Sequence, residues 1–296
     1  MEIDSFYTQE KKYVLNSFYL KIIACLLMTL DHVALLFVDS QLNPDLYFIL
    51  RAIGKISFPI FAYLSFESIN RSKHPVKYLL TLLAFSLSID IFGYIFSAIK
   101  KITISNNPFI GNVFTDLFLG TLTIYLLKKK NWISVFAVFP VAYAILSNLV
   151  ISQNYGTLFK TDWGTFSICL FILFFITREA YHFSLIKKAN DLNVDVHSMY
   201  QEQIVMYDNI LASVSLVFNE LLFYLIYKIN NQTTFIPNEF VPIGTYSTLA
   251  IVFILLNNGK RGYDNKFIRY SFYCYYPLHL IILGIFSLFF GILKNF

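Results

Sequence analysis

Charged side chains are scarce in this 296-residue sequence: Asp, Glu, Lys and Arg make up 14% of it, against about 25% in ordinary globular domains. Apolar residues make up 57%, with 32 phenylalanines and 21 tyrosines. So few charges cannot cover a surface that faces water, which excludes a soluble enzyme, a secreted globular domain and a disordered chain. The bulk of the chain must therefore face lipid.

Cysteine is nearly missing as well. The three cysteines stand inside apolar runs without the spacing of metal ligands, and we interpret them as small hydrophobic side chains: Cys25, Cys169 and Cys274. The sequence therefore predicts no metal site. Charged residues among the first 19 make that stretch too polar for a cleavable signal peptide.

Glycine and proline are few, at 11 and 8 residues. No stretch rich in Gly, Pro or Ser divides the chain, so residues 1–296 are predicted to form a single integral membrane domain. No matching pair of interrupted helices recurs in two halves, which argues mildly against an inverted-repeat transporter.

Long apolar runs predict an all-α, polytopic membrane helix bundle, because a bilayer core of about 30 Å needs roughly 20 apolar residues per helix. Transmembrane barrels would show shorter, alternating runs instead. We predict about nine transmembrane helices, at 20–38, 46–69, 76–99, 110–127, 131–151, 163–177, 210–229, 241–256 and 270–293. The runs at 163–177 and 241–256 are the shortest.

The basic residues predict how these spans are oriented. With the N-terminus cytoplasmic, 16 lysines and arginines fall in inside segments and 5 in outside segments, as the positive-inside rule requires. This pattern places the C-terminus outside. The net charge of +5 then marks cytoplasmic loops rather than a nucleic-acid surface. The polar connection 178–209 is predicted to be cytoplasmic, with a helix near the lipid headgroups.

Ionisable residues within the predicted spans are candidates for function, since a charge at the bilayer centre costs at least about 2.5–3.5 kcal/mol. They are Asp31, His32, Arg51, Lys55, Glu67, Asp90, Asp116, Glu220 and His279. The predicted topology places six of them in one charged layer of the outer half: Asp31, His32, Arg51, Lys55, Asp90 and Asp116. Glu67 is predicted near the inner surface and His279 nearer the middle.

Two cations, Arg51 and Lys55, stand four residues apart and hence on one helix face. One interpretation is structural: the aspartates of the layer neutralise them and lock the bundle. The other is functional: the pair receives an anionic ligand such as a phosphate or a thioester carrier. The pattern alone leaves both open.

Histidine is the natural general base near neutral pH. Asp31 and His32 are neighbours in sequence, about 100° apart on a helix, so they cannot form a dyad with each other. Each must find a partner on another span. His32 or His279 could act as a base, or either could be only a hydrogen bond between helices.

Several of these residues lie in motifs that resemble the TraX family. The motifs are Met28-Thr29-Leu30-Asp31-His32-Val33, the run from Arg51 to Tyr63 that reads R-x-x-G-K-x-x-F-P-I-F, the run from Asn112 to Gly120, Asp162-Trp163-Gly164, and Tyr276-Pro277-Leu278-His279-Leu280. The resemblance covers most of residues 16–176 and 270–284. The first two motifs together are the most specific.

The resemblance implies a bacterial-type cytoplasmic-membrane acetyltransferase, associated with N-terminal acetylation of pilin. The implied donor is acetyl-CoA, and the implied partner is a protein or cell-envelope acceptor with an amine or hydroxyl. Three residues are expected to be catalytic: Asp31, His32 and His279. Six are expected to bind substrate or donor: Arg51, Lys55, Asp90, Asn112, Asp116 and Tyr276. A transporter or flippase with an intramembrane charged site and a non-catalytic assembly protein are the alternatives.

Overall fold

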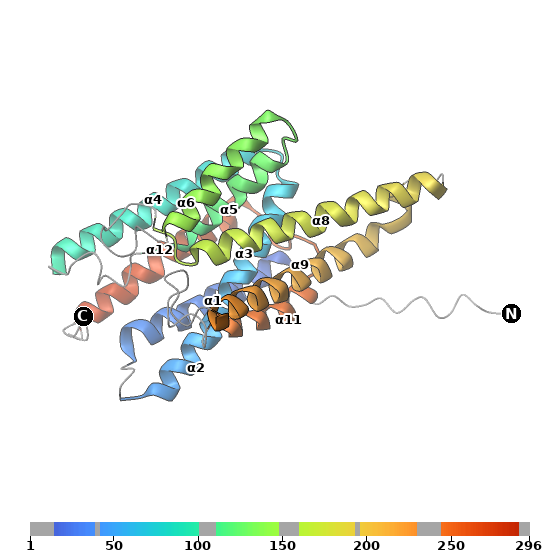
Figure 1. Ribbon diagram of the computed structural model, residues 1–296. Helices are drawn as coiled ribbons and strands as arrows, with labels where there is room; N and C mark the ends of the chain where they lie inside the picture. The colour runs from blue at the N-terminus through green and yellow to red at the C-terminus, as the bar shows by residue number, and fades with distance from the viewer. Residues whose placement is uncertain are drawn as a thin grey trace.

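The computed structural model describes residues 15–38, 42–100, 111–147, 160–192, 196–229 and 244–289. The regular elements of these residues are helices (Figure 1). In chain order they are α1 (Ser17–Phe37), α2 (Pro44–Lys55), α3 (Ser57–Arg71), α4 (Pro75–Lys100), α5 (Val113–Leu127), η2 (Trp132–Ala137), α6 (Val138–Leu146), α8 (Gly164–Leu192), α9 (Val196–Ile229), η4 (Thr245–Leu249), α11 (Ala250–Leu255) and α12 (Lys266–Phe289). The predicted all-helical fold is confirmed.

Five helical stretches of the described residues are long and apolar enough to cross a membrane. They are Ser17–Phe37, Pro44–Arg71, Pro75–Ile99, Gly164–Asp191 and Val205–Lys228. Three shorter apolar stretches accompany them: Val113–Leu127, Trp132–Leu146 and Thr245–Leu255. The chain is therefore an integral membrane protein, while the count of nine spans and their orientation stay predictions.

Asparagine side chains begin several of the helices. The Asn16 side chain accepts hydrogen bonds from the backbone N–H groups of Phe18 and Tyr19, both at 3.1 Å, at the start of α1. Asn112 and Asn131 do the same for α5 and η2. A short polar side chain at this position satisfies backbone donors that the first helical turn leaves unpaired.

The predicted second span, 46–69, is two helices instead of one. Helix α2 ends at Lys55 and α3 begins at Ser57. Pro59 explains the break, because proline has no N–H to donate to the carbonyl four residues earlier, which is that of Lys55. The proline of the F-P-I-F motif thus interrupts the chain beside one of the two predicted cations.

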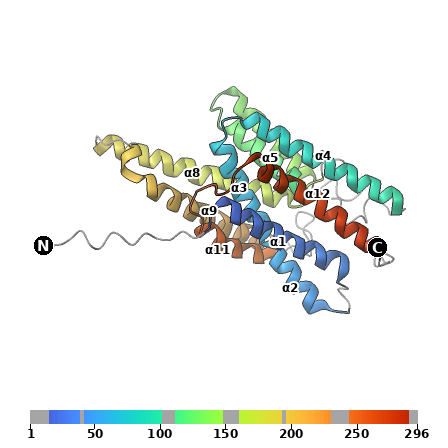
Figure 2. The ribbon, with the colours of Figure 1, turned by 180° about the vertical axis from the view of Figure 1, so that it is seen from behind.

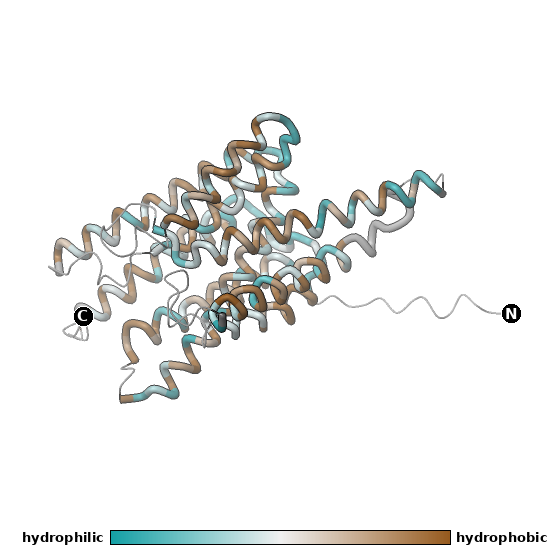
Figure 3. Tube along the Cα trace, viewed as in Figure 1, coloured by the Kyte–Doolittle hydropathy of each residue, from teal (hydrophilic) through white to brown (hydrophobic). Residues whose placement is uncertain are grey.

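The polar connection 178–209 is not a separate helix. Its first part continues α8 and its last part begins α9, and these two helices pack against each other along their length. Figure 1 shows this pair extending beyond the rest of the bundle, and Figure 3 shows hydrophilic residues toward its far end. Residues 193–195 lie outside the described part of the chain.

Other predicted boundaries shift by a few residues. The run 131–151 is η2 followed by α6, and the run 241–256 is η4 followed by α11. Helix α12 begins at Lys266, four residues before the predicted start. Parts of these runs, at 148–151, 241–243 and 290–293, lie outside the described residues.

Helix α3 lies at the centre of the bundle. Of the five long apolar stretches, the one that contains it is the most enclosed, at 61% buried, and α1, α5, α8 and α11 all contact α3. Phe58 and Tyr63 of α3 are fully buried, and they belong to the same apolar cluster as Phe166 and Phe174 of α8. Seen from behind, α1 and α12 run next to each other across this core (Figure 2).

Candidate functional site

Asp31 of α1 joins both predicted cations of α2. The Arg51 guanidinium donates to Asp31 Oδ2 at 2.7 Å, and Lys55 Nζ lies 3.8 Å from the same oxygen. The three side chains are between 12% and 15% exposed. Two cations therefore share one carboxylate in a largely buried place, which leaves this group with one unit of positive charge in excess.

Gly54 makes this approach possible. A Cβ on Gly54 would overlap the Asp31 side chain and would lie 2.8 Å from the Asp31 Cα. Without that atom, α2 packs directly on α1 between Arg51 and Lys55. The glycine of the R-x-x-G-K motif is thus a requirement of packing, since no larger residue would let both cations reach Asp31.

The two histidines meet between α1 and α12. His279 Nε2 lies 3.3 Å from His32 Nδ1, and the two rings are edge-on with centroids 5.0 Å apart. His279 was predicted nearer the middle of the membrane than His32. The structure brings the two side chains into contact, so they lie at one level along the α1–α12 pair, while their depth in the membrane stays a prediction.

The carbonyl partners of the histidines fix where the protons lie. His32 Nδ1 is 2.9 Å from the Met28 carbonyl, and His279 Nδ1 is 3.0 Å from the Tyr275 carbonyl. A carbonyl only accepts, so both neutral rings carry their proton on Nδ1. His279 Nε2 then accepts from His32. Among the described residues, His32 Nε2 has no hydrogen-bond partner, which leaves its lone pair available.

The start of α8 closes the site on another side. Lys55 Nζ lies over the Trp163 ring, 5.2 Å from its centroid, and Trp163 stacks on Phe58 at 4.4 Å. Asp162 is exposed and lies within electrostatic range of His32 and Tyr276. The charged site therefore reaches the surface of the protein near Asp162.

Asp116 binds backbone instead of a cation. Its carboxylate accepts hydrogen bonds from the N–H groups of Asp162 at 2.8 Å, Trp163 at 3.0 Å and Gly164 at 2.8 Å. The side chain is buried and forms no ion pair among the described residues. Of the predicted aspartates, Asp116 thus holds the first turn of α8, where a negative charge is favoured.

Asp90 and Asn112 contact each other. The Asn112 amide donates to the Ser86 carbonyl at 2.8 Å and to Asp90 Oδ1 at 3.2 Å. Tyr276 lies edge-on to both histidines and to Phe114 of α5. Asp90 and Asn112 thus join α4 to α5, whereas Tyr276 lies at the histidine pair.

Three residues of the site were not among the predicted ones. Asp162 and Trp163 stand in the weakest of the quoted motifs, and an acidic residue before Trp-Gly at the start of an apolar run was the signal that could have pointed to them. Tyr275 was hidden in an aromatic run. Its hydroxyl lies 2.6 Å from the Thr29 hydroxyl, which ties α12 to α1 one turn from the histidines.

The described residues contain no group of three His, Cys, Asp or Glu side chains that could hold a metal ion. The groups around the histidine pair are the Asp31 and Asp162 carboxylates, the two cations of α2, two imidazoles and the phenols of Tyr275 and Tyr276. These groups suit proton transfer and charge stabilisation.

A family model described as TraX protein matches residues 17–228. The chain belongs to the TraX family. The match extends past the motif resemblance, which ended at 176, and stops short of the stretch at 270–284. The TraX match therefore covers Asp31, His32, Arg51 and Lys55, while His279 lies outside it.

A curated relative of this TraX protein is the probable fimbrial assembly protein FimC, serogroup H1, of Dichelobacter nodosus. The two are 26% identical over 156 residues, which cover 52% of this chain and 59% of the relative. The chain thus spans about three-fifths of the length of that relative. No solved structure matches this chain significantly.

Proposed function

We propose that this TraX protein transfers an acyl group from a thioester to an amine or hydroxyl inside the membrane. The donor we propose is acetyl-CoA. The acceptor we propose is the N-terminus of an exported protein such as a pilin-like subunit. The observation that carries this proposal is the contact between His32 and His279 beside the Asp31–Arg51–Lys55 group.

In the proposed reaction, the acceptor nitrogen or oxygen attacks the thioester carbonyl carbon. His32 Nε2 takes the proton that the acceptor loses. The carbon–sulfur bond then breaks, and the sulfur leaves as a thiol because protonated His32 returns the proton to it. His279 is a positioning residue, because its Nε2 accepts from His32 Nδ1 and holds the ring as it becomes charged.

The excess positive charge of Arg51 and Lys55 over Asp31 favours this chemistry. When the acceptor adds to the carbonyl, negative charge develops on the carbonyl oxygen. Preorganised cations in a site with little water stabilise such an oxyanion strongly. Since Lys55 Nζ is 3.8 Å from Asp31, beyond hydrogen-bond distance, its ammonium can turn toward the oxyanion.

Two observations support a protein acceptor from outside. Exposed Asp162 lies within electrostatic range of His32, so an α-ammonium group would meet a carboxylate on its way in. The predicted orientation puts residues 152–162 outside. The relative from Dichelobacter nodosus is named for fimbrial assembly, which makes a pilin-like subunit the first acceptor to test.

Purified protein with labelled acetyl-CoA and a peptide bearing a free pilin-like N-terminus tests the proposal. Wild type should transfer label, and His32→Gln should lose about 10²–10⁴-fold in turnover. His74→Gln is the matched control, since His74 is exposed at the start of α4. Equal turnover of His32→Gln and wild type would contradict the proposal, and uptake of a solute without transfer would identify a transporter.

A further inference from the structure

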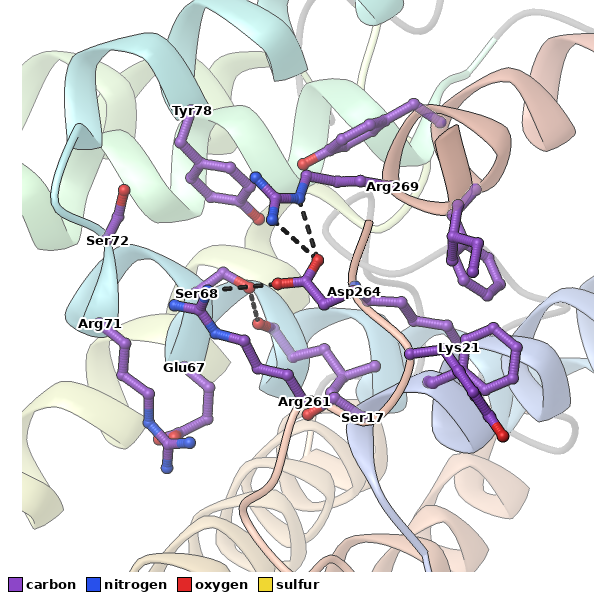
Figure 4. A pocket seen from close by; sticks show the side chains of 16 residues that line it. Ser17, Lys21, Glu67, Ser68, Arg71, Ser72, Tyr78, Arg261, Asp264 and Arg269 are labelled. Atoms are coloured by element: carbon purple, nitrogen blue, oxygen red, sulfur yellow. Dashed lines mark hydrogen bonds and ion pairs between the residues drawn. The ribbon is translucent and has the colours of Figure 1, made fainter. Parts of the chain in front are cut away.

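A cavity of about 160 Å³ opens near the N-terminal ends of α1 and α12, away from the two histidines (Figure 4). Its walls come from the first turns of α1, the last turns of α3, the first turn of α4, the loop before α12, and α12 itself. The predicted orientation places this end in the cytoplasm. We refer to it as the basic cavity.

Cations outnumber carboxylates in the basic cavity. Lys21, Arg71, Arg261 and Arg269 line it together with Glu67 and Asp264. Asp264 lies between two of the arginines: Arg261 Nη1 is 3.2 Å from Oδ2, and Arg269 Nη2 is 2.9 Å from Oδ1. In Figure 4 the three side chains point toward one another across the cavity. The wall thus has two positive charges in excess.

Lys21 adds a cation without a carboxylate. Among the described residues Lys21 forms no ion pair, and its Nζ lies 5.5 Å from the centroid of the Phe272 ring. A half-buried ammonium group held over a ring is ready to bind an anion. Figure 4 shows Lys21 on the side of Asp264 away from the Arg71–Glu67 pair.

Aromatic rings surround this lysine. Phe18 contacts Tyr263 and Phe272 edge-on, with centroids 5.4 and 5.7 Å apart. The Tyr263 side chain is 68% exposed and offers a free face. A planar base stacks on such a ring while its phosphates meet arginine and lysine.

The loop that carries these groups is fixed in place. Ser17 N–H donates to the Lys260 carbonyl at 2.9 Å, and Arg71 Nη1 donates to the Gly259 carbonyl at 2.7 Å. The loop is therefore tied to both α1 and α3. A preformed wall loses little entropy when it binds a ligand.

We propose that the basic cavity binds the phosphate-bearing nucleotide end of the donor thioester. This inference rests on the proposed function. Lys21 precedes His32 by eleven residues of α1, and Arg269 precedes His279 by ten residues of α12, which is about 15–16 Å along either helix. That separation is comparable to an extended pantetheine arm, so the thioester would reach the histidines.

Binding of coenzyme A to the detergent-purified protein, measured by calorimetry, tests this inference without needing transfer. Lys21→Gln and Arg261→Gln should each weaken binding by about ten-fold. Lys77→Gln is the control, because Lys77 is exposed on α4 near the cavity and does not line it. Pantetheine, which lacks the nucleotide, should bind weakly to all four proteins.

A second measurement covers the case in which a variant does not fold. The variant Tyr263→Cys should react with a soluble maleimide and be protected by acetyl-CoA, whose sulfur is blocked as a thioester and does not consume the reagent. Unchanged coenzyme A affinity in both glutamine variants, or protection by phosphatidylglycerol vesicles and not by acetyl-CoA, would overturn the inference. Normal coenzyme A binding that depends on Lys21 but leads to no transfer would overturn the proposed function alone.

Discussion

At Gly54 a single hydrogen atom stands where another residue would carry a methyl group, and α2 lies on α1 for that reason. We expect Gly54→Ala to lower the thermal midpoint, because overpacking a close contact costs about 1–3 kcal/mol. Folded Gly54→Ala should also lose turnover, since Arg51 and Lys55 would move away from Asp31.

Thermal unfolding and transfer assays on the same sample check this expectation. Ile49→Ala on the exposed side of α2 is the control and should change neither quantity by much. If Gly54→Ala unfolds and turns over like wild type, the packing of α2 against α1 does not set the position of the cations.

His279 differs from His32 in what a substitution should do. A positioning residue needs only an acceptor for the His32 Nδ1–H group, and a glutamine carbonyl can supply one. We expect His279→Gln to retain about ten-fold more turnover than His279→Leu, whereas His32→Gln should be as impaired as His32→Leu. Turnover measurements on the four variants decide it, and equal loss in both His279 variants would make His279 a base itself.

Asp264 gives the basic cavity a pH dependence. Burial raises the pKa of the Asp264 carboxyl, but the hydrogen bonds and charges of Arg269 and Arg261 outweigh burial and lower that pKa below its ordinary value. A lowered pKa stabilises the fold above the unfolded carboxyl's pKa, and this contribution disappears as the pH falls through the folded pKa. The effect is small, because solvent screens a partly exposed group.

We therefore expect wild type to exceed Asp264→Asn in thermal midpoint at neutral pH, with the difference shrinking as the solution is acidified. Thermal scans of both proteins from neutral to acidic pH measure this difference in thermal midpoint. A difference that grows toward acid pH would mean that the arginines do not lower this pKa.

At the scale of elements, the Asp116 carboxylate stabilises the N-terminal end of α8. Its two oxygens accept from the N–H groups of Asp162, Trp163 and Gly164, which lead into the helix. Asp116→Ala leaves those donors without their partner, at a cost of about 1–3 kcal/mol for each buried group. We expect a large fall in thermal midpoint for Asp116→Ala, a smaller one for Asp116→Asn, and near-normal turnover of the folded Asp116→Asn fraction.

Loss of turnover in Asp116→Asn at an unchanged thermal midpoint would give Asp116 a direct part in the reaction instead. Thr123→Ala on the same helix is a control for a buried polar residue away from the site, since its hydroxyl donates only to the Leu119 carbonyl.

Much of the element level was predictable from composition and apolar periodicity, because the bilayer imposes one length on every spanning helix. The break at Ile56 was not predictable, because the apolar run 46–69 is long enough to read as one helix. The effect of Pro59 is local, since its missing N–H leaves only the Lys55 carbonyl without a donor. The long α8–α9 pair was not predictable from the sequence either. Its polar residues resemble a loop in sequence, and only packing between the two helices keeps them regular.

Part of the site was predictable for a similar reason. A buried cation needs a carboxylate, so an aspartate of the charged layer could be expected to pair with Arg51 and Lys55, although the sequence did not show that Asp31 would be the one. The meeting of His32 and His279 could not be, because residue counting along single spans ignores how far each helix is shifted along its neighbour. Asp116 was assigned to the cations since sequence does not show that a backbone turn would use all of its acceptors.

At the scale of the whole molecule, orientation is the quantity to measure. The basic residues predict that the far end of the α8–α9 pair is cytoplasmic and that the α1–α2 turn is outside. In a cysteine-free background, Leu42→Cys should react with an impermeant maleimide in intact cells, and Lys187→Cys should react only after permeabilisation. Both positions are exposed. The reverse labelling would show that the protein is inserted in the opposite orientation, with the basic cavity outside.

Helices α1 and α12 carry the basic cavity at one end and a histidine toward the other. The number of residues between Lys21 and His32 therefore sets the distance from the basic cavity to the histidine pair. A one-residue insertion there would turn every later side chain by about 100° and advance it by about 1.5 Å, so that His32 would no longer face His279. Among relatives, the number of residues between Lys21 and His32 is thus expected to stay fixed.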